Sequence, residues 1–118
     1  VACQAPAAAE DPNAGRINEI GDFLKTQRDA RGRMLQVVRI PSPGRVETED
    51  GDIAPASHMN FLIGNATVVV PTYGTKTAQA AVDALKPFFP GRNVVGLPSR
   101  HILSGGGSFH CITQQQPA

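Results

Sequence analysis

The stretch His58–Pro98, HMNFLIGNATVVVPTYGTKTAQAAVDALKPFFPGRNVVGLP, decides the fold because hairpin, helix and strand patterns follow one another in it. Apolar runs at 58–63 and 67–71 flank a short break, which predicts a β-hairpin. Gly64 and Asn65 in the break suit the positive φ angles of a tight turn. The stretch is therefore expected to begin with two antiparallel strands.

A helix and one more strand are predicted after the hairpin. Apolar residues recur at helical spacing between about Thr77 and Phe88, and the Pro90–Gly91 pair ends the helix. The short apolar run at 93–98 then predicts a strand that leads into a glycine cluster. Strands that alternate with a helix in this way indicate an α/β protein.

The residues upstream continue the alternation. From Arg16 onward, apolar residues recur at helical spacing, beginning with Ile17, and Gly32 is placed to end that helix. The run 34–40 predicts a buried strand stopped by Pro41, and the polar stretch 41–57 predicts a long loop. One full ββαβ unit and part of another are thus expected, and a single such unit leaves sheet edges open.

Composition narrows the class of protein. The 118 residues, 41% hydrophobic and 18% charged, fit one globular domain. The net charge of +1 gives no electrostatic basis for binding nucleic acid or an anionic membrane, and no apolar run approaches a membrane span. The two cysteines show no metal-ligand spacing, so we expect no metal and a reduced, cytoplasmic setting.

The stretch SGGGSFHCITQQQ, residues 104–116, carries the candidate chemistry. Three consecutive glycines free the backbone from Cβ restrictions, so that its amides or carbonyls can approach a small ligand. The single cysteine of the stretch is a nucleophile in its thiolate form. The candidate site residues are Cys111 as nucleophile and, for substrate binding, Gly105, Gly106 and Gly107.

A general base for Cys111 is not fixed by the sequence. If the stretch is extended, neighbouring side chains point to opposite faces, and His110 then faces away from the site. His58, His101 and residues outside these 118 are the alternatives. Each feature also has a non-functional interpretation. A lone cysteine is usually a small buried hydrophobic residue, and a run of glycines is usually a flexible loop. An acidic run such as 47–52 is usually exposed to solvent and binds nothing.

The terminal residues GGGSFHCITQQQPA resemble the C-terminal signature of the agmatine deiminases. These enzymes are grouped with the bacterial peptidyl-arginine deiminases in the guanidino-group-modifying superfamily. Three further stretches, DARGRMLQVVRIPSPG (29–44), SHMNFLIGNATVVVP (57–71) and ALKPFFPGRNVVGLPSRHILSGGG (84–107), follow the order and spacing of that family. The resemblance implies that residues 1–118 are a C-terminal fragment of a single deiminase domain.

The resemblance also implies a fold and a reaction. The family fold is a five-bladed α/β propeller, or pentein, built from ββαβ units. Its members hydrolyse a guanidinium, agmatine among them, to a ureido group and ammonia without metal or organic cofactor. The motif cysteine, here Cys111, attacks the guanidinium carbon, a histidine acts as acid and base, and carboxylates grip the substrate.

Departures from the family pattern define the alternatives. The family's His-x-Asp motif and acidic substrate residues lie upstream of the matched region, so we expect the 118 residues alone to lack deiminase activity and to need a missing N-terminal part of the same protein. His58 stands where the family often has an aromatic residue, and Ser108 where it often has Asn. The alternatives are a deiminase of peptidyl or free arginine and an inactive remnant that binds a partner; a homo-oligomer is also left open.

Overall fold

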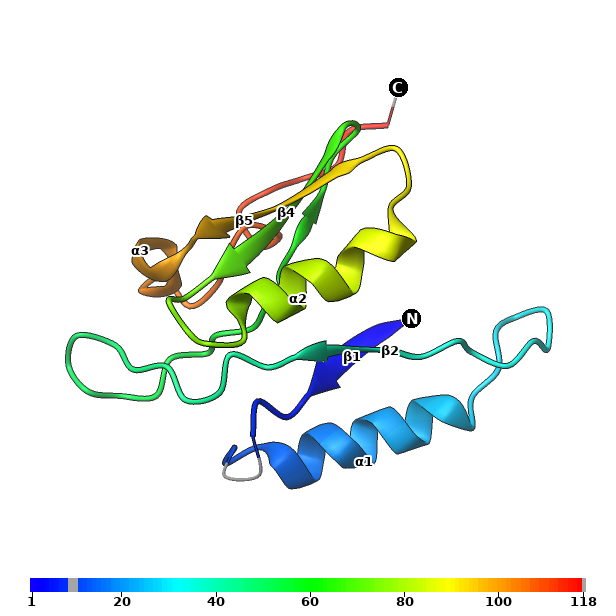
Figure 1. Cartoon of the computed structure of the whole chain (residues 1–118), viewed down its shortest axis with the longest axis horizontal. Coiled ribbons are helices and arrows are strands. Elements are labelled where there is room, and N and C mark those ends of the chain that lie inside the picture. The colour runs from blue at the N-terminus through cyan, green and yellow to red at the C-terminus, as the bar shows by residue number, and fades with distance from the viewer. Residues whose placement is uncertain (9–10, 118) are drawn as a thin grey trace.

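The computed structural model describes residues 1–8 and 11–117 and shows two small β-sheets with helices packed against them (Figure 1). The first sheet pairs β1 (Ala2–Ala5) with β2 (Val38–Pro41) in parallel, in a register that places Ala2 opposite Val38. The helix α1 (Ala14–Lys25) connects these two strands and packs against β1. This is a β–α–β crossover, as parallel strands require.

The second sheet has the strand order β3-β4-β5. A hairpin joins β3 (Leu62–Ile63) to β4 (Thr67–Thr72), and β5 (Asn93–Pro98) lies parallel to β4. Between β4 and β5 the chain forms α2 (Ala78–Leu85) and a 3-10 turn, η1 (Lys86–Phe88). A short helix, α3 (Arg100–Leu103), follows β5. The predicted α/β class is confirmed.

The main core lies around α2. This helix contacts β2 of the first sheet and both β4 and β5 of the second, and Figure 1 shows it between the two sheets. Apolar residues cover a wide stripe of the α2 surface, so the helix can pack against both sheets. The buried residues of this core are Ile40, Val68, Val70, Ala81, Val82, Leu85 and Val94. The two units therefore share one hydrophobic core.

A second buried cluster anchors the long connection between the sheets. Val46 and Ala54 of that connection pack with Tyr73 and Leu103, the latter from α3. An isolated antiparallel bridge between Glu47 and Ile53 closes the polar part of the loop. The predicted loop therefore exists, but apolar side chains at both ends fix it to the body of the protein.

The prediction that the first helix continues to Gly32 is wrong. The helix α1 ends at Lys25, and Gly32 lies in a separate turn, with a φ angle of 75°. The Asp29 carboxylate accepts hydrogen bonds from the backbone N–H groups of Arg31 and Arg33. An aspartate that satisfies nearby backbone donors favours a turn over a further helical turn.

The predicted strand limits also need correction. The strand β2 begins at Val38 rather than Met34, whose side chain is 51% exposed, and it includes Pro41, which pairs opposite Ala5. Proline is compatible with the end of a strand because one missing N–H interrupts little of the ladder. The hairpin is confirmed, but its first strand has two residues and neither Gly64 nor Asn65 has a positive φ.

Asp11 ties the start of α1 to the end of β2. One carboxylate oxygen accepts the backbone N–H of Asn13 at 2.9 Å, and the other accepts the N–H of Ala7 at 3.0 Å and the Ser42 hydroxyl at 2.9 Å. Burial acts to raise the pKa of this carboxyl, but the three hydrogen bonds outweigh burial and hold the pKa below 3.8. Asp11 is therefore expected to stabilise the fold as a carboxylate.

Replacing Asp11 by asparagine is expected to lower the free energy of unfolding by about 1–2 kcal/mol at neutral pH. Because the folded-state pKa is depressed, this stabilisation is complete above pH 3.8 and is lost as the pH falls through the folded-state value. Urea unfolding of both proteins near neutral pH and in acid measures the difference. A difference that stays constant into acid would contradict this role.

Candidate functional site

Asn60 and Cys111, 51 residues apart, meet in the structure. The Asn60 side-chain Nδ2 donates to Cys111 Sγ at 2.9 Å, and its Oδ1 accepts the Cys111 backbone N–H at 3.2 Å. The Asn60 backbone carbonyl accepts the His110 N–H at 3.3 Å. One residue in the loop before β3 thus holds the motif that contains the candidate nucleophile, which is exposed.

The glycine cluster is shaped around the cysteine. A Cβ on Gly107 would lie 2.8 Å from Cys111 Cβ and 3.1 Å from its Sγ, so only glycine fits without displacing the cysteine. Gly106 has a φ angle of 86°, a conformation that other residues rarely adopt. At Gly105 a Cβ would make only an ordinary contact, 3.4 Å from the Ile102 carbonyl. Glycine is therefore required at 107 for lack of space and favoured at 106 by the backbone conformation, whereas neither reason applies at 105.

Ser108 fixes the other side of the motif. Its side chain is 1% exposed, and its hydroxyl hydrogen-bonds the equally buried hydroxyl of Ser99, the residue before α3. Its backbone carbonyl accepts the N–H of Ile112 at 3.3 Å. The cysteine thus lies on a turn that is attached to Asn60 on one side and to the start of α3 on the other.

The surroundings of Cys111 favour its ionised form. The hydrogen bond from Asn60 and then a backbone hydrogen bond from Ser108 lower the pKa of the thiol below its ordinary value of 9.0. Donors that point at sulfur stabilise the thiolate relative to the thiol. The thiolate is the reactive form of cysteine, so this geometry raises the fraction of Cys111 in the reactive form at a given pH.

The condition on which His110 was expected to face away from the site, an extended stretch around Cys111, is not met. Residues 109–112 form turns, with the Thr113 N–H donating to the His110 carbonyl at 3.2 Å. The strand argument for the direction of His110 therefore fails. His110 is exposed, and its backbone N–H and carbonyl, rather than its ring, make its hydrogen bonds within the described residues.

Replacing His110 by alanine in the full-length protein is expected to leave kcat within about tenfold of the unchanged enzyme, whereas loss of a general base costs 10²–10⁴-fold. Alanine keeps the backbone hydrogen bonds to Asn60 and Thr113 that the structure shows. Steady-state kinetics with circular dichroism as a folding control measures this. A loss as large as that caused by Cys111→Ala would identify His110 as a base.

His58 occupies a structural position. It does not begin a strand; it lies in a turn with its side chain fully buried, and its Nδ1 hydrogen-bonds the Pro71 carbonyl at 2.7 Å. Burial lowers the pKa of the ring, an effect that this carbonyl partly opposes. The ring is fully buried and does not present a surface to a ligand beside the exposed Cys111. The structure thus gives no support to His58 as the base.

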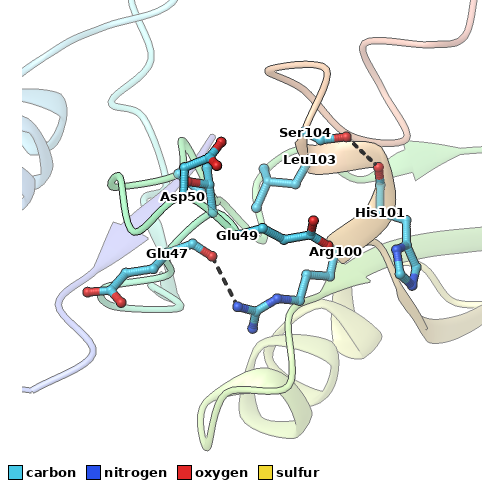
Figure 2. Close-up of a pocket in the computed structure, with 9 residues that line it drawn as sticks. Glu47, Glu49, Asp50, Arg100, His101, Leu103 and Ser104 are labelled. Carbon is cyan, nitrogen blue, oxygen red and sulfur yellow. Dashed lines mark hydrogen bonds between the residues drawn. The ribbon is translucent and has the colours of Figure 1, made fainter.

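His101 lies on the exposed side of α3, at a separate pocket (Figure 2). This pocket, of about 410 Å³, lies between α3 and the acidic loop 47–50, and Arg100 crosses it to donate to the Glu47 carbonyl at 3.0 Å. Cys111 is not among the lining residues. Within residues 1–8 and 11–117, no three His, Cys, Asp or Glu side chains gather in a way that could hold a metal ion.

The sequence did not indicate Asn60 as a site residue. An asparagine before an apolar run is ordinary in a loop, and its contact with Cys111 spans 51 residues. Of the residues predicted for the site, the structure brings Gly107 against Cys111, while His58 is buried against the Pro71 carbonyl and His101 lines a pocket that does not include Cys111. In the described part of the chain no helix is long and apolar enough to cross a membrane.

The fold and the site together describe part of an α/β protein with an exposed, hydrogen-bonded thiol on a glycine-shaped turn. The family profile of the Porphyromonas-type peptidyl-arginine deiminases matches residues 1–117. The chain belongs to this family, as its resemblance in sequence led us to expect.

Similar proteins of known name and similar solved structures are consistent with membership of this family. The agmatine deiminase of Stutzerimonas stutzeri is 39% identical over 127 residues, which cover 93% of this chain and 34% of the relative. The solved structure of the agmatine deiminase of Enterococcus faecalis matches with a TM-score of 0.88 and 32% identity, over 98% of this chain and 36% of that one. The agmatine deiminase of C. jejuni, at 23% identity and a TM-score of 0.74 over 93% of this chain and 31% of that one, shares the fold. The chain spans about a third of the length of these relatives.

Proposed function

We propose that this chain is the C-terminal, nucleophile-bearing part of an agmatine deiminase and contributes ββαβ structure to a five-bladed α/β propeller. The observation that carries the proposal is Cys111, an exposed thiol that accepts a hydrogen bond from Asn60 and lies against a glycine that no other residue can replace without a clash. Named agmatine deiminases among the relatives give the substrate class.

The proposed reaction has two covalent steps at Cys111. The thiolate attacks the guanidinium carbon and forms a C–S bond, and one C–N bond then breaks as a general acid donates a proton to the leaving nitrogen and ammonia departs. The deprotonated form of that acid then takes a proton from water, the water oxygen bonds to the same carbon, and the C–S bond breaks to return the thiolate. Agmatine and water thus give N-carbamoylputrescine and ammonia. A strong nucleophile is needed because the guanidinium charge is delocalised.

The glycine turn is proposed to bind the substrate. Gly105 and Gly106 are exposed beside the cysteine turn, and backbone carbonyls there can accept guanidinium N–H groups where side chains would obstruct. The base and the carboxylates that grip the guanidinium are proposed to come from residues outside these 118, since His58 is fully buried and His101 lines a pocket that does not include Cys111. A cytoplasmic setting, in which the thiol stays reduced, fits this chemistry.

A deiminase of arginine or of peptidyl-arginine is the second candidate, because the family profile carries the name of a peptidyl-arginine deiminase. The full-length protein should be given agmatine, free arginine and an arginine-containing peptide in parallel, with ammonia and ureido product as readouts. We expect the highest kcat/KM for agmatine. A higher value for the peptide or for arginine would select the second candidate, and no turnover of any of the three would indicate an inactive remnant.

A further inference from the structure

We propose that the hydroxyls of Ser99 and Ser108 act as one positioning pair for the nucleophile: the Ser99 hydroxyl, fixed where β5 ends, holds the residue that begins the turn around Cys111. This inference rests on the proposed function for its catalytic meaning. The hydroxyl pair and its effect on the thiol belong to the folded protein, so they can be measured without turnover.

Ser99 is a firm support because both of its backbone groups are hydrogen-bonded. Its N–H donates to the carbonyl of Thr72, the last residue of β4, at 2.9 Å. Its carbonyl accepts the N–H groups of Ile102 and Leu103, at 3.2 and 3.1 Å, as α3 begins. The Ser99 side chain therefore starts from a point that the sheet fixes, and its hydroxyl reaches a second segment of the chain.

The two hydroxyls depend on each other because they are closed to solvent. Ser99 and Ser108 are each 1% exposed, and one hydroxyl donates to the other. The bond replaces hydrogen bonds to water that burial removes, and a buried hydroxyl left without a partner is destabilising. Replacing either serine therefore breaks the link and leaves the other hydroxyl unsatisfied.

The pair closes a loop that contains the glycine cluster. Ser99 and Ser108 are nine residues apart, and the three glycines at 105–107 lie between them. Consecutive glycines have wide conformational freedom, which alone would let the segment after them take many positions. The hydroxyl bond fixes the far end of this run, so the freedom of the glycines does not extend to the cysteine.

The backbone around Ser108 lies against the thiol. The Ser108 carbonyl accepts the Ile112 N–H at 3.3 Å, so residues 108–112 form one closed turn that includes Cys111. The residue before this turn is so near that a Cβ on Gly107 would lie 3.1 Å from the cysteine Sγ. A backbone hydrogen bond from Ser108 also helps to lower the pKa of the thiol. A displacement of Ser108 would therefore move backbone groups that stabilise the thiolate.

The test compares Ser99→Ala and Ser108→Ala with the control Ser104→Ala in the full-length protein. The Ser104 hydroxyl also lies beside the glycines, but it is exposed and donates to the His101 carbonyl. The rate of Cys111 alkylation by iodoacetamide, followed by peptide mapping, is measured against pH. Each of the first two variants should raise the pH midpoint and slow alkylation below it by about three- to tenfold, with rates that converge at high pH. The control should keep the midpoint of the unchanged protein.

The double alanine variant tests whether the two serines act as a unit. Its midpoint should be close to that of either single variant, because the first replacement already removes the hydrogen bond. Single shifts that add in the double variant would show two separate roles. Folded single variants that keep the midpoint would show a merely structural role, even if their rates fell equally at every pH. Either result overturns the proposal.

Ser99→Cys covers the case in which the alanine variants do not fold. It nearly keeps the volume of the buried side chain, while a thiol is a weak hydrogen-bond donor. Trypsin cuts after Arg100, so position 99 and Cys111 are mapped on separate peptides. We expect the midpoint to rise here as well, and a folded variant with an unchanged midpoint contradicts the proposal. If every variant but the Ser104 control fails to fold, the pair serves folding alone and the proposal is wrong.

The alkylation midpoint also separates two failures, because it reports on the hydroxyl pair whether or not agmatine is a substrate. If the midpoints shift but the unchanged protein turns over neither agmatine nor arginine, the proposed function is removed and the effect of the pair on the thiol stands. If the unchanged protein turns over agmatine and the variants keep its midpoint, the positioning role is removed and the proposed function stands.

Discussion

Replacing Cys111 by serine in the full-length protein is expected to lower kcat for agmatine by at least about three orders of magnitude. A serine hydroxyl has the shape of the thiol, but it is far harder to ionise and the Asn60 donor cannot make it a comparable nucleophile. Ammonia release under saturating agmatine measures the loss. Mass spectrometry of the unchanged protein under turnover should also show a covalent adduct on Cys111.

The other cysteine supplies the control. Cys3 is 7% exposed and lies in β1, so a haloacetamidine should label Cys111 and leave Cys3 unmodified. Cys3→Ser is expected to retain turnover, with any loss traceable to stability, because a buried cysteine behaves as a small hydrophobe. Labelling at Cys3 with Cys111 unmodified would contradict the assignment of the nucleophile.

Replacing Gly107 by alanine is expected to lower kcat on the order of a hundredfold, the usual effect of displacing a reacting group by about 1 Å. The new Cβ would lie 2.8 Å from Cys111 Cβ, a separation that folded proteins do not tolerate, so the cysteine must move. Its alkylation rate should change as well, because the sulfur would leave the Asn60 amide. Kinetics and alkylation on the same preparation measure both effects.

The matched control lies two residues earlier in the same cluster. A Cβ at Gly105 meets its nearest atom, the Ile102 carbonyl oxygen, at 3.4 Å, and Gly105 has no positive φ. Gly105→Ala should therefore retain the alkylation rate and fold. If both variants lost reactivity equally, the effect would come from flexibility of the glycine run and not from contact with Cys111.

Local patterns predicted the elements whose interactions are local or strongly periodic. The hairpin, the helix α2 and the strand β5 follow from apolar spacing and from breakers such as Pro90 and Gly91. The end of α1 was not predictable in this way, because a local carboxylate, Asp29, stabilised a turn where the pattern alone allowed more helix.

The candidate site shows the same division. The glycines and Cys111 stand out in the sequence because they are consecutive or nearly so. The turn at 109–112 cannot be recognised in the sequence. It is held by Asn60, which is far away along the chain, and by the hydroxyl pair of Ser99 and Ser108, whose residue types are common in loops. Side chains that meet only after folding leave no mark on spacing, so the partner of the nucleophile could be found only in the structure.

The position of α2 has a consequence for how the protein is assembled. The helix belongs to the second unit by sequence, yet it also covers the sheet of the first, with Ile40 of β2 in the same core as Val82 and Leu85. Neither unit has a finished interior when separated from its neighbour, which is the situation of stacked repeats. Cutting the chain between the two units would therefore expose the core of both. Each unit is a structural element of the chain and is not expected to fold alone. Loss of either unit should melt the other, so unfolding of the pair is expected to be a single cooperative event.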